Sequence, residues 1–358
     1  MRVCVYAICK NEEQFVERWV ESMKEADVII VLDTGSTDKT VKKLREKGVI
    51  VYEEVISPWR FDVARNKSLA HVPRNVDVCV CTDLDEVLNK GWRAALERDW
   101  QPTTTQGRYL YNWSMHPDGS PDVQFEYLKI HKRQGFYWTY PVHEILKYRG
   151  KQTKETFLHD VILTHYPDET KSRTSYLPLL EMAVKENPQD DRMTYYLGRE
   201  YMYQKQYVSC VKTLTQYLGL KSAIWDEERS AAMRLIARSY EVMNQKEEAY
   251  GWYYRAIAQC PHMRESYVEC AKYAYVNKEF EVCFFMISQA LKIKEKSSTY
   301  VNMGYAWDHT PHDLMAISSY YLGLFDQAYE HAKKALVYAP KNKRLQDNLH
   351  LIENKIKK

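Results

Sequence analysis

Several features that would narrow the function at once are missing from this sequence of 358 residues. None of its eight cysteines forms a C-x-x-C pair, its net charge is only +3, and its apolar runs are short. The small net charge argues against a nucleic-acid binder held by electrostatics. The apolar stretch 3–9 is shorter than the roughly 20 residues that span a bilayer, so neither a signal peptide nor a membrane span is expected.

Most of the cysteines lie within apolar patterns typical of strands or helices. This placement indicates reduced, packed thiols, and not zinc ligands or a disulfide framework. We therefore expect a cytoplasmic protein, although a chain that works on the cytosolic face of a membrane would have the same composition.

A glycine-rich loop is also missing after the first expected strand, where the sequence reads AICKNEE. Enzymes that wrap a dinucleotide or a triphosphate in backbone amides need glycine at this position. Its absence argues against a dinucleotide-binding oxidoreductase and disfavours a sugar-phosphate nucleotidyltransferase.

Residues 1–170 alternate short apolar runs with helical segments. The expected strands are RVCVYAI, DVIIVLD, VIVYEEV and DVCVCTD. Such alternation predicts an α/β domain with a mostly parallel sheet covered on both faces. Ligands of these sheets bind at the carboxyl ends of the strands. Lys10, Asn11, Asp33 and Asp83 are therefore expected along one rim, with Ser36 or Thr37 as the cap of the second helix.

Residues 171–358 show a helical repeat in place of the strand pattern. Small residues recur at one register with spacings of 39, 34 and 45, at Gly198, Ala237, Ala271 and Ala316. Further small residues follow 12 and 19 positions later, and Pro261 and Pro340 fall where second helices should end. This pattern predicts an all-α domain of four tetratricopeptide-like hairpins.

The acidic turn DLDE follows the fourth expected strand. Asp83 and Asp85 flank Leu84, so an extended turn can aim both carboxylates to the same side while Leu84 packs inward. Hard oxygen donors at this spacing suit Mg²⁺ or Mn²⁺, which would hold a nucleotide diphosphate and neutralise its charge as it leaves. The alternative is a solvated acidic turn.

Four short motifs follow one another along the first 170 residues, in the order CKNEE, DTGSTDKT, ARNKS and TDLDE. Over residues 1–170 they resemble the family 2 glycosyltransferases, which have a GT-A fold. With helical repeats behind this domain, the whole chain resembles the branch that includes the bacteriocin peptide S-glycosyltransferases. The resemblance implies an inverting, metal-dependent transfer of a sugar from a nucleotide donor, taken as a UDP-sugar, to a glycan or peptide acceptor.

The resemblance also implies roles for individual residues. Asp33 would accept from the uracil N–H, and Asp83 would reach both the ribose and the metal. Asp85 would bind the metal directly, and Arg65 would lie beside the sugar-nucleotide pocket unless it is only a surface ion pair. Three further residues would lie against the nucleoside, namely Lys10, Asn11 and Glu12.

Two later segments, YWTYPVHEIL and VILTHYPDE, supply the remaining candidates. His165 follows an apolar strand and can complete the metal coordination, or it is a packed, hydrogen-bonded histidine. Glu144 is the candidate general base, with apolar neighbours expected to raise its proton affinity. Asp122, Asp160 and Asp168 are its rivals.

Other functions remain open alternatives: a repeat scaffold without activity, or a nucleotidyltransferase. A homodimer through the repeats is also expected, because Leu349 and Ile352 in the last segment would have only the final hairpin to cover them; the alternative is that this closing helix simply caps the stack. Nothing in the sequence identifies the sugar or the acceptor.

Overall fold

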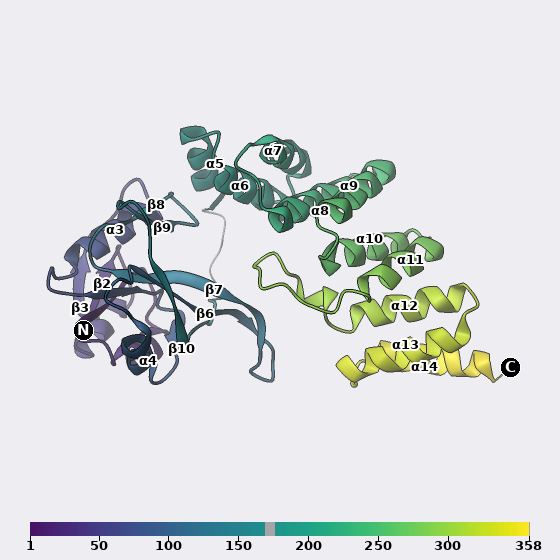
Figure 1. The fold of residues 1–358 in the computed structure, drawn as a ribbon, viewed down its shortest axis with the longest axis horizontal. Helices are drawn as coiled ribbons and strands as arrows, with labels where there is room; N and C mark the ends of the chain where they lie inside the picture. Colours follow the sequence, from purple (N-terminus) through teal and green to yellow (C-terminus); the bar gives the residue numbers. More distant parts are fainter. Residues whose placement is uncertain (169–175, 358) are drawn as a thin grey trace. The chain divides into compact units, whose positions relative to one another are not determined.

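The computed structural model describes residues 1–168 and 176–357 and divides into two compact units, Met1–Ala183 and Val184–Lys358 (Figure 1). An α/β unit is followed by an all-helical unit, which confirms the predicted fold class. The expected boundary at residue 170 lies outside the described residues. Among the described helices, none combines the length and the apolar composition needed to cross a membrane.

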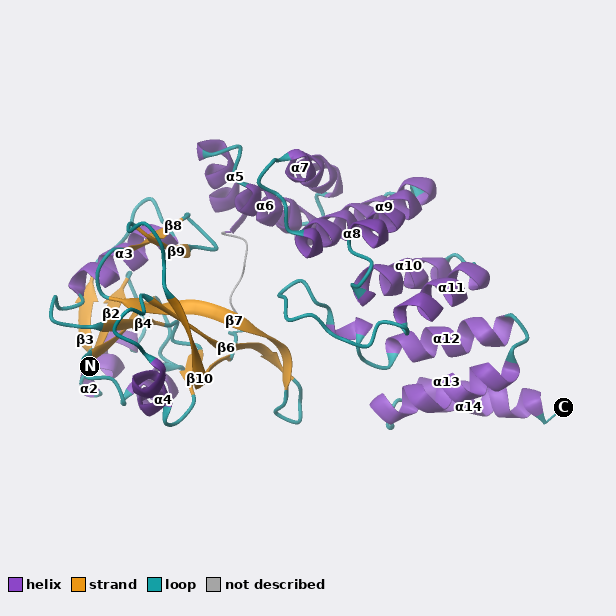
Figure 2. Ribbon diagram, in the orientation of Figure 1, coloured by secondary structure: helices purple, strands orange, loops and turns teal. Residues whose placement is uncertain are grey.

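Unit 1 contains an eight-stranded sheet in the order β3-β2-β1-β4-β7-β6-β10-β5 (Figure 2). Its first four strands run parallel to one another and are β1 Val3–Cys9, β2 Val28–Asp33, β3 Ile50–Glu53 and β4 Val78–Cys81. The rest of the sheet is formed by β5 Glu86–Leu88, β6 Gln106–Met115, β7 Pro121–Lys132 and β10 Glu155–His165. Strand β7 pairs antiparallel with both β4 and β6, and β10 pairs parallel with β6.

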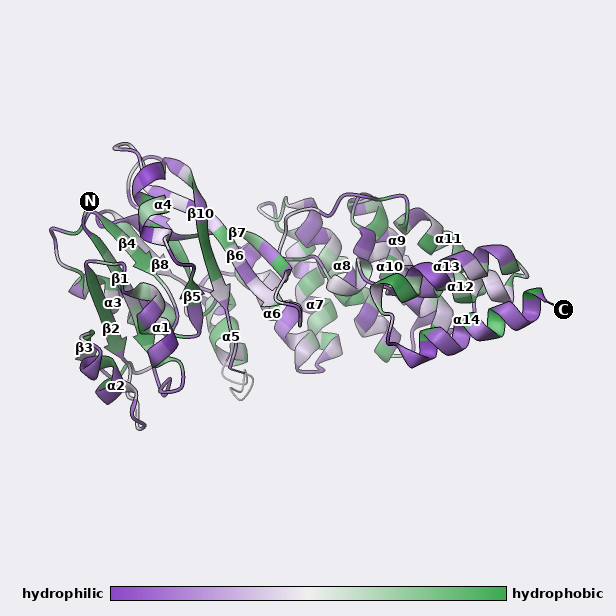
Figure 3. Cartoon of the chain, turned by 90° about the horizontal axis from the view of Figure 1, so that it is seen from below, coloured by the Kyte–Doolittle hydropathy of each residue, from purple (hydrophilic) through white to green (hydrophobic). Residues whose placement is uncertain are grey.

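Strand β1 explains why the sheet is covered on both sides. All seven of its residues are buried, and alternate side chains enter different clusters. Val5 packs in the cluster of Trp19 and Trp92, whereas Tyr6 packs with Leu69 on the other face. Hydrophobic residues accordingly dominate β1 and β2 in Figure 3. This double burial is what a parallel sheet requires.

The helices of unit 1 are α1 Val16–Met23, α2 Thr40–Glu46, α3 Phe61–His71 and α4 Trp92–Asp99, and α5 Tyr176–Glu186 extends past the boundary between the units at residue 183. Helices α1, α2 and α4 contribute to one cluster, and α3 packs on the opposite face of the sheet. A separate hairpin, β8 Phe136–Thr139 and β9 Ile145–Tyr148, contacts α3.

Unit 2 consists of four helical hairpins and a closing helix, as the repeat pattern predicts. The helices are α6 Asp191–Tyr203, α7 Tyr207–Gly219, α8 Asp226–Val242, α9 Lys246–Gln259, α10 Arg264–Val276, α11 Phe280–Ala290, α12 Thr310–Tyr321, α13 Phe325–Tyr338 and α14 Lys343–Ile356, with the short 3₁₀ helix η1 Gly304–Ala306 before α12. The small repeat residues lie at the contacts between these helices. A Cβ on Gly198 would come within 2.4 Å of Leu214 in the partner helix.

Helix α14 covers the end of the repeat stack. Ile352 is buried against Ala316, Ala328 and Ala332, and Leu349 packs on the same cluster. The apolar face that motivated a homodimer is therefore covered by the last hairpin, so a homodimer through the repeats stays a prediction that this packing does not itself require.

Candidate active site

The loops after β1 and β2 are joined by hydrogen bonds at the carboxyl ends of these strands. Asn11, with φ of 54°, donates its backbone N–H to Ser36 Oγ (2.8 Å) and accepts from Thr37 N–H (2.7 Å). The Glu12 N–H donates to Thr40 Oγ1 at 2.7 Å. These two loops of the predicted rim are therefore connected to each other, and Lys10 is exposed on the first of them.

The assignment of Ser36 or Thr37 as a helix cap is wrong. Helix α2 begins at Thr40, whose N–H donates to Asp38 Oδ1 at 2.9 Å. The side chains of residues 36 and 37 are instead used to connect the two loops, because they reach the loop after β1.

Asp33 ends β2 and organises the turn that follows. It is 2% exposed, and its Oδ1 accepts from the N–H groups of Gly35 (3.0 Å) and Ser36 (2.9 Å). Ser36 Oγ donates to the other carboxylate oxygen. Gly35 adopts φ of 109°, a conformation that side chains disfavour. Any contact of Asp33 with a nucleobase would thus come from a carboxylate that already shapes its own loop.

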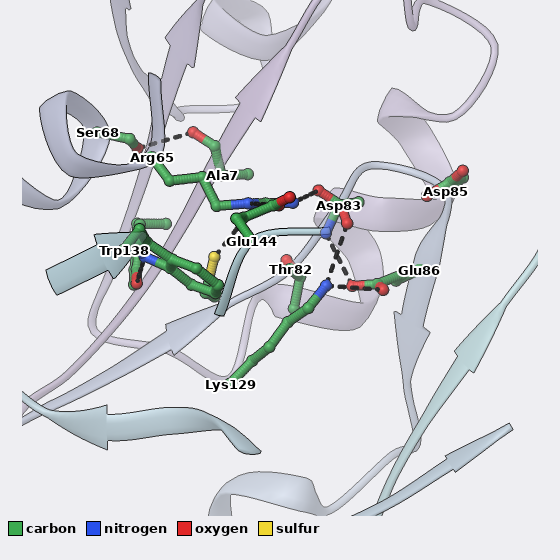
Figure 4. A network of polar contacts seen from close by, with 12 residues as sticks. Ala7, Arg65, Ser68, Thr82, Asp83, Asp85, Glu86, Lys129, Trp138 and Glu144 are labelled. Atoms are coloured by element: carbon green, nitrogen blue, oxygen red, sulfur yellow. Dashed lines mark hydrogen bonds and ion pairs between the residues drawn. The ribbon is translucent and has the colours of Figure 1, made fainter. Parts of the chain in front are cut away.

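Arg65 on α3 is the centre of a buried charged network (Figure 4). Its guanidinium donates to Asp83 Oδ1 at 2.7 Å and to Glu144 Oε1, and it lies 5.1 Å from the Trp138 ring. Only 4% of the Arg65 side chain is exposed. The alternative of a surface ion pair is therefore excluded for this arginine.

Lys129 and Glu86 complete the network, and neither was assigned a role from the sequence. Lys129 Nζ on β7 donates to Asp83 Oδ2 (3.1 Å) and Glu86 Oε1 (3.3 Å). Glu86 also accepts from the Asp83 N–H (2.8 Å) and from Tyr111 Oη (2.8 Å). A lysine within the apolar end of a strand was the available signal, because a buried cation needs a carboxylate partner.

The network fixes the charge of its members. Burial alone would raise the pKa of the Asp83 carboxyl, but Arg65 and Lys129 hold that pKa below its ordinary value. Burial, opposed by Lys129 and reinforced by Asp83, raises the pKa of Glu86. Because 34% of the Asp83 side chain is exposed, against 2% for Glu86, Asp83 is the charged oxygen donor that a ligand can reach.

Asp85 and His165 form a second pair at the same rim. His165 Nε2 lies 3.4 Å from Asp85 Oδ2, and its Nδ1 lies 3.3 Å from the Trp113 carbonyl oxygen. The Trp113 ring stacks on the imidazole at 4.7 Å and fixes its plane. Burial would lower the pKa of His165, but the Asp85 carboxylate raises it overall.

A carboxylate oxygen and an imidazole nitrogen that face each other fit a divalent cation such as Mn²⁺. The three expected metal ligands are less closely gathered than predicted. Asp83 directs both carboxylate oxygens to Arg65 and Lys129, and in Figure 4 Asp85 lies apart from that network. Asp85 and His165 thus fit a metal together, whereas Asp83 would have to exchange a cationic partner for it.

Glu144 is positioned by the β8–β9 hairpin, which is fastened to α3. Asn66 donates its side-chain amide to the Trp138 carbonyl (2.8 Å) and accepts from the Trp138 N–H (2.9 Å). The turn contains Tyr140 and His143 at positive φ, of 80° and 50°. Non-glycine residues in this conformation are costly and cluster at functional sites. The expected apolar surroundings of Glu144 are wrong in one respect, because the Arg65 cation lies directly against it.

The rival bases lie elsewhere in unit 1. Asp122 accepts from Ser114 Oγ at 3.0 Å, and Asp168 accepts from Gln14 at 2.9 Å. Asp160 forms an exposed ion pair with Arg98 at 3.2 Å. Of these four carboxylates, Glu144 is the one that joins the network of Arg65 and Asp83.

Comparison with known proteins identifies a family for most of unit 1. Residues 4–146 match the family described as Glycosyl transferase family 2. The N-terminal domain belongs to glycosyl transferase family 2. This glycosyltransferase domain contains β1 to β4, the acidic turn and Glu144, whereas His165 lies beyond the matched residues.

A related protein of Rickettsia bellii (strain RML369-C), named "Uncharacterized glycosyltransferase", is 36% identical over 110 residues, which are 30% of this chain and 36% of that protein. The match thus spans about a third of the length of that relative. Solved structures that resemble the chain include YrrB, titled a TPR protein with an unusual peptide-binding site (12% identity, 50% of this chain, 84% of that chain, TM-score 0.41). Another is MamA (18% identity, 50% of this chain, 99% of that chain, TM-score 0.39).

Proposed function

We propose that the chain is an inverting, metal-dependent glycosyltransferase that uses a UDP-sugar. The observation that carries the proposal is the convergence of Arg65, Asp83 and Glu144 at the strand-end rim of a family 2 domain. Asp33 and the loop of Lys10, Asn11 and Glu12 lie on the same rim and are assigned to the nucleoside.

The proposed chemistry divides among the residues at the rim. Asp85 and His165, with Asp83, would hold Mn²⁺ or Mg²⁺, which when bound supplies positive charge for the departing diphosphate. Arg65 orients Glu144 through its Nε–H and keeps Asp83 charged. Glu144 Oε2, the oxygen opposite the one that Arg65 contacts, takes the proton of the acceptor nucleophile as that atom attacks the anomeric carbon.

Unit 2 is assigned to acceptor recognition. Tetratricopeptide-like arrays bind extended segments on their exposed helix faces. A glycan or peptide acceptor, a cytoplasmic location and a homodimer through the repeats complete the proposal. Sedimentation of the intact chain at micromolar concentration distinguishes monomer from dimer.

The test is the hydrolysis of a panel of nucleotide sugars by the purified full chain, with and without Mn²⁺. Release of UDP from at least one UDP-sugar, dependent on the cation, supports the proposal. Release of pyrophosphate from a sugar phosphate and UTP would identify a nucleotidyltransferase instead. No turnover of any donor, together with retained binding of a protein partner, would identify a scaffold.

A further inference from the structure

We propose that unit 2 carries a zinc site formed by Glu227, Cys260 and His262, separate from the glycosyltransferase rim. Glu227 lies in the first turn of α8, Cys260 follows the last residue of α9, and His262 lies in the linker before α10. Among the described residues, this is the one group of three or more histidine, cysteine and acidic side chains whose ligand atoms all lie within 4.8 Å of one another.

Two of the three separations suit a single tetrahedral ion, once the imidazole turns its Nε2 lone pair toward the sulfur, because Cys260 Sγ also lies 3.8 Å from Nδ1. His262 Nε2 lies 3.5 Å from Cys260 Sγ and 3.6 Å from Glu227 Oε1. Bonds of about 2.3 Å from zinc to sulfur and about 2.0–2.1 Å to nitrogen or oxygen, at a tetrahedral angle, place S and N about 3.6 Å apart and N and O about 3.4 Å apart. The imidazole nitrogen is therefore already at ligand separation from both of its neighbours.

The donor set suits zinc more than a harder cation. One thiol, one imidazole and one carboxylate are all common zinc ligands, and three of them leave a fourth position for water. Deprotonated Cys260 and Glu227 together carry two negative charges, which balance the ion.

The repeat itself does not require these side chains. The equivalent positions two hairpins later are Ala339, Pro340 and Lys341, aligned by the 79-residue offset between Ala256 and Ala335. The backbone is the same in both places: Cys260 has φ −144° and ψ 77°, and Ala339 has φ −138° and ψ 66°. Cys260 is fully buried on this shared backbone, whereas His262, with 62% of its side chain exposed, is an addition that packing does not explain.

From the sequence, Cys260 is expected to be a packed thiol because most of the cysteines lie in apolar patterns, and no C-x-x-C pair marks this site. The ligands here are spaced as Cys-Pro-His, with the third supplied 33 residues earlier from α8. A bound ion would join the start of α8 to the α9–α10 linker and so connect the second hairpin to the third.

The test uses the full chain, stripped of metal and titrated with Co²⁺ and Zn²⁺ alone. Cobalt bound to a thiolate gives a charge-transfer band in the near ultraviolet, which the carboxylate and imidazole of the rim cannot give. The variant C260A/H262K carries the side chains of the last hairpin at this place and is expected to fold. His262 is a safe site to change because its side chain is 62% exposed.

The wild type is expected to show the band and to bind one zinc more per chain than C260A/H262K, which should lack the band. Glu227→Gln should weaken zinc binding at least tenfold. His331→Ala removes one member of the His312–His331 pair, whose Nδ1 atoms lie 2.9 Å apart, and should leave the band unchanged. A band retained in C260A/H262K, a band lost in His331→Ala, or no band in the wild type at micromolar metal overturns the proposal.

Discussion

At the scale of single residues, the charged network of unit 1 depends on Lys129, a cation that is 6% exposed. Replacing it in Lys129→Met leaves Asp83 and Glu86 without their shared partner. Removing one member of a buried ion pair costs about 3–5 kcal/mol. We expect a lower unfolding temperature for Lys129→Met together with loss of sugar transfer.

The matched control is Lys67→Met. Lys67 pairs with Glu54 at the surface, where both side chains are 43% exposed, and such pairs contribute about 0–1 kcal/mol. Equal losses of stability in the two variants would show that the Lys129 network has no special energetic role.

His131 gives unit 1 a defined dependence on pH. Its Nδ1 lies 2.8 Å from the Lys132 carbonyl and must donate to it, so Nε2 accepts from Tyr6 Oη at 2.9 Å. Burial lowers the pKa of His131 from 6.5 to about 4. The unfolded chain takes up this proton first, so the stabilising contribution is complete above pH 6.5 and is lost as the pH falls towards 4.

The expected loss is on the order of 3 kcal/mol over that interval. Urea unfolding between pH 4 and 7 measures it, and the variant His131→Gln, which can keep one donor and one acceptor, should show a flatter profile. An identical slope in both proteins would mean that other groups cause the acid sensitivity.

The positions of three acidic residues could be predicted from the local sequence. Asp33, Asp83 and Asp85 follow apolar strands directly, and the sheet topology brings their loops to one rim. The partners of Arg65 were not predictable, since Asp83 and Glu144 lie 18 and 79 positions away. Lys129 was missed for the same reason, because its carboxylates are 43 and 46 positions distant.

At the scale of elements, the β8–β9 hairpin is expected to set the position of Glu144. Asn66→Ala removes both side-chain hydrogen bonds to Trp138 and leaves two backbone groups to find water. A buried unsatisfied group costs about 1–3 kcal/mol. We expect a modest fall in unfolding temperature and at least a tenfold fall in kcat, because Glu144 is no longer held against Arg65.

The control for Asn66→Ala is Asn89→Ala. Asn89 also binds two backbone groups, the Asp160 carbonyl oxygen and the Ile162 N–H, both at 2.8 Å. Asn89→Ala should lose stability while it retains most of the turnover. If both variants lose turnover equally, the hairpin does not position Glu144 in particular.

The repeat contacts make an equally specific prediction for unit 2. In Gly198→Ala the new methyl group meets Leu214 within 2.5 Å, and overpacking of this kind costs about 1–3 kcal/mol. In Gly251→Ala the methyl group meets nothing within 4 Å, and a helical glycine replaced by alanine gains about 0.5–1 kcal/mol. Thermal unfolding should therefore move in opposite directions, and a shift of the same sign in both would contradict the predicted packing.

Helices and strands were predictable where the spacing of apolar or small residues in the sequence was regular. The parallel strands β1 to β4 follow from apolar runs separated by helices, and the repeats follow from recurring small residues. Strands β6 and β7 were not predicted, because their burial depends on antiparallel neighbours in the sheet. The start of α2 was misplaced because Ser36 and Thr37 bond to another loop.

At the scale of the whole molecule, the chain has two compact units with separate cores. Unit 1 has its own sheet, rim and charged network, and unit 2 has its own stack of hairpins closed by α14. The length and the change of period from strands to helices were sufficient to predict this organisation. The identities of donor and acceptor depend on the shape of bound states, which neither local pattern nor composition encodes.

The most direct test of the glycosyltransferase assignment compares Asp85→Ala with the wild type in the turnover of the UDP-sugar that the panel identifies, at saturating Mn²⁺. Asp118→Ala, an exposed turn carboxylate, is the control. Loss of a metal ligand forfeits several kcal/mol of transition-state stabilisation, which predicts at least a 100-fold lower rate at an unchanged unfolding temperature. Turnover of Asp85→Ala close to that of the wild type would contradict the account.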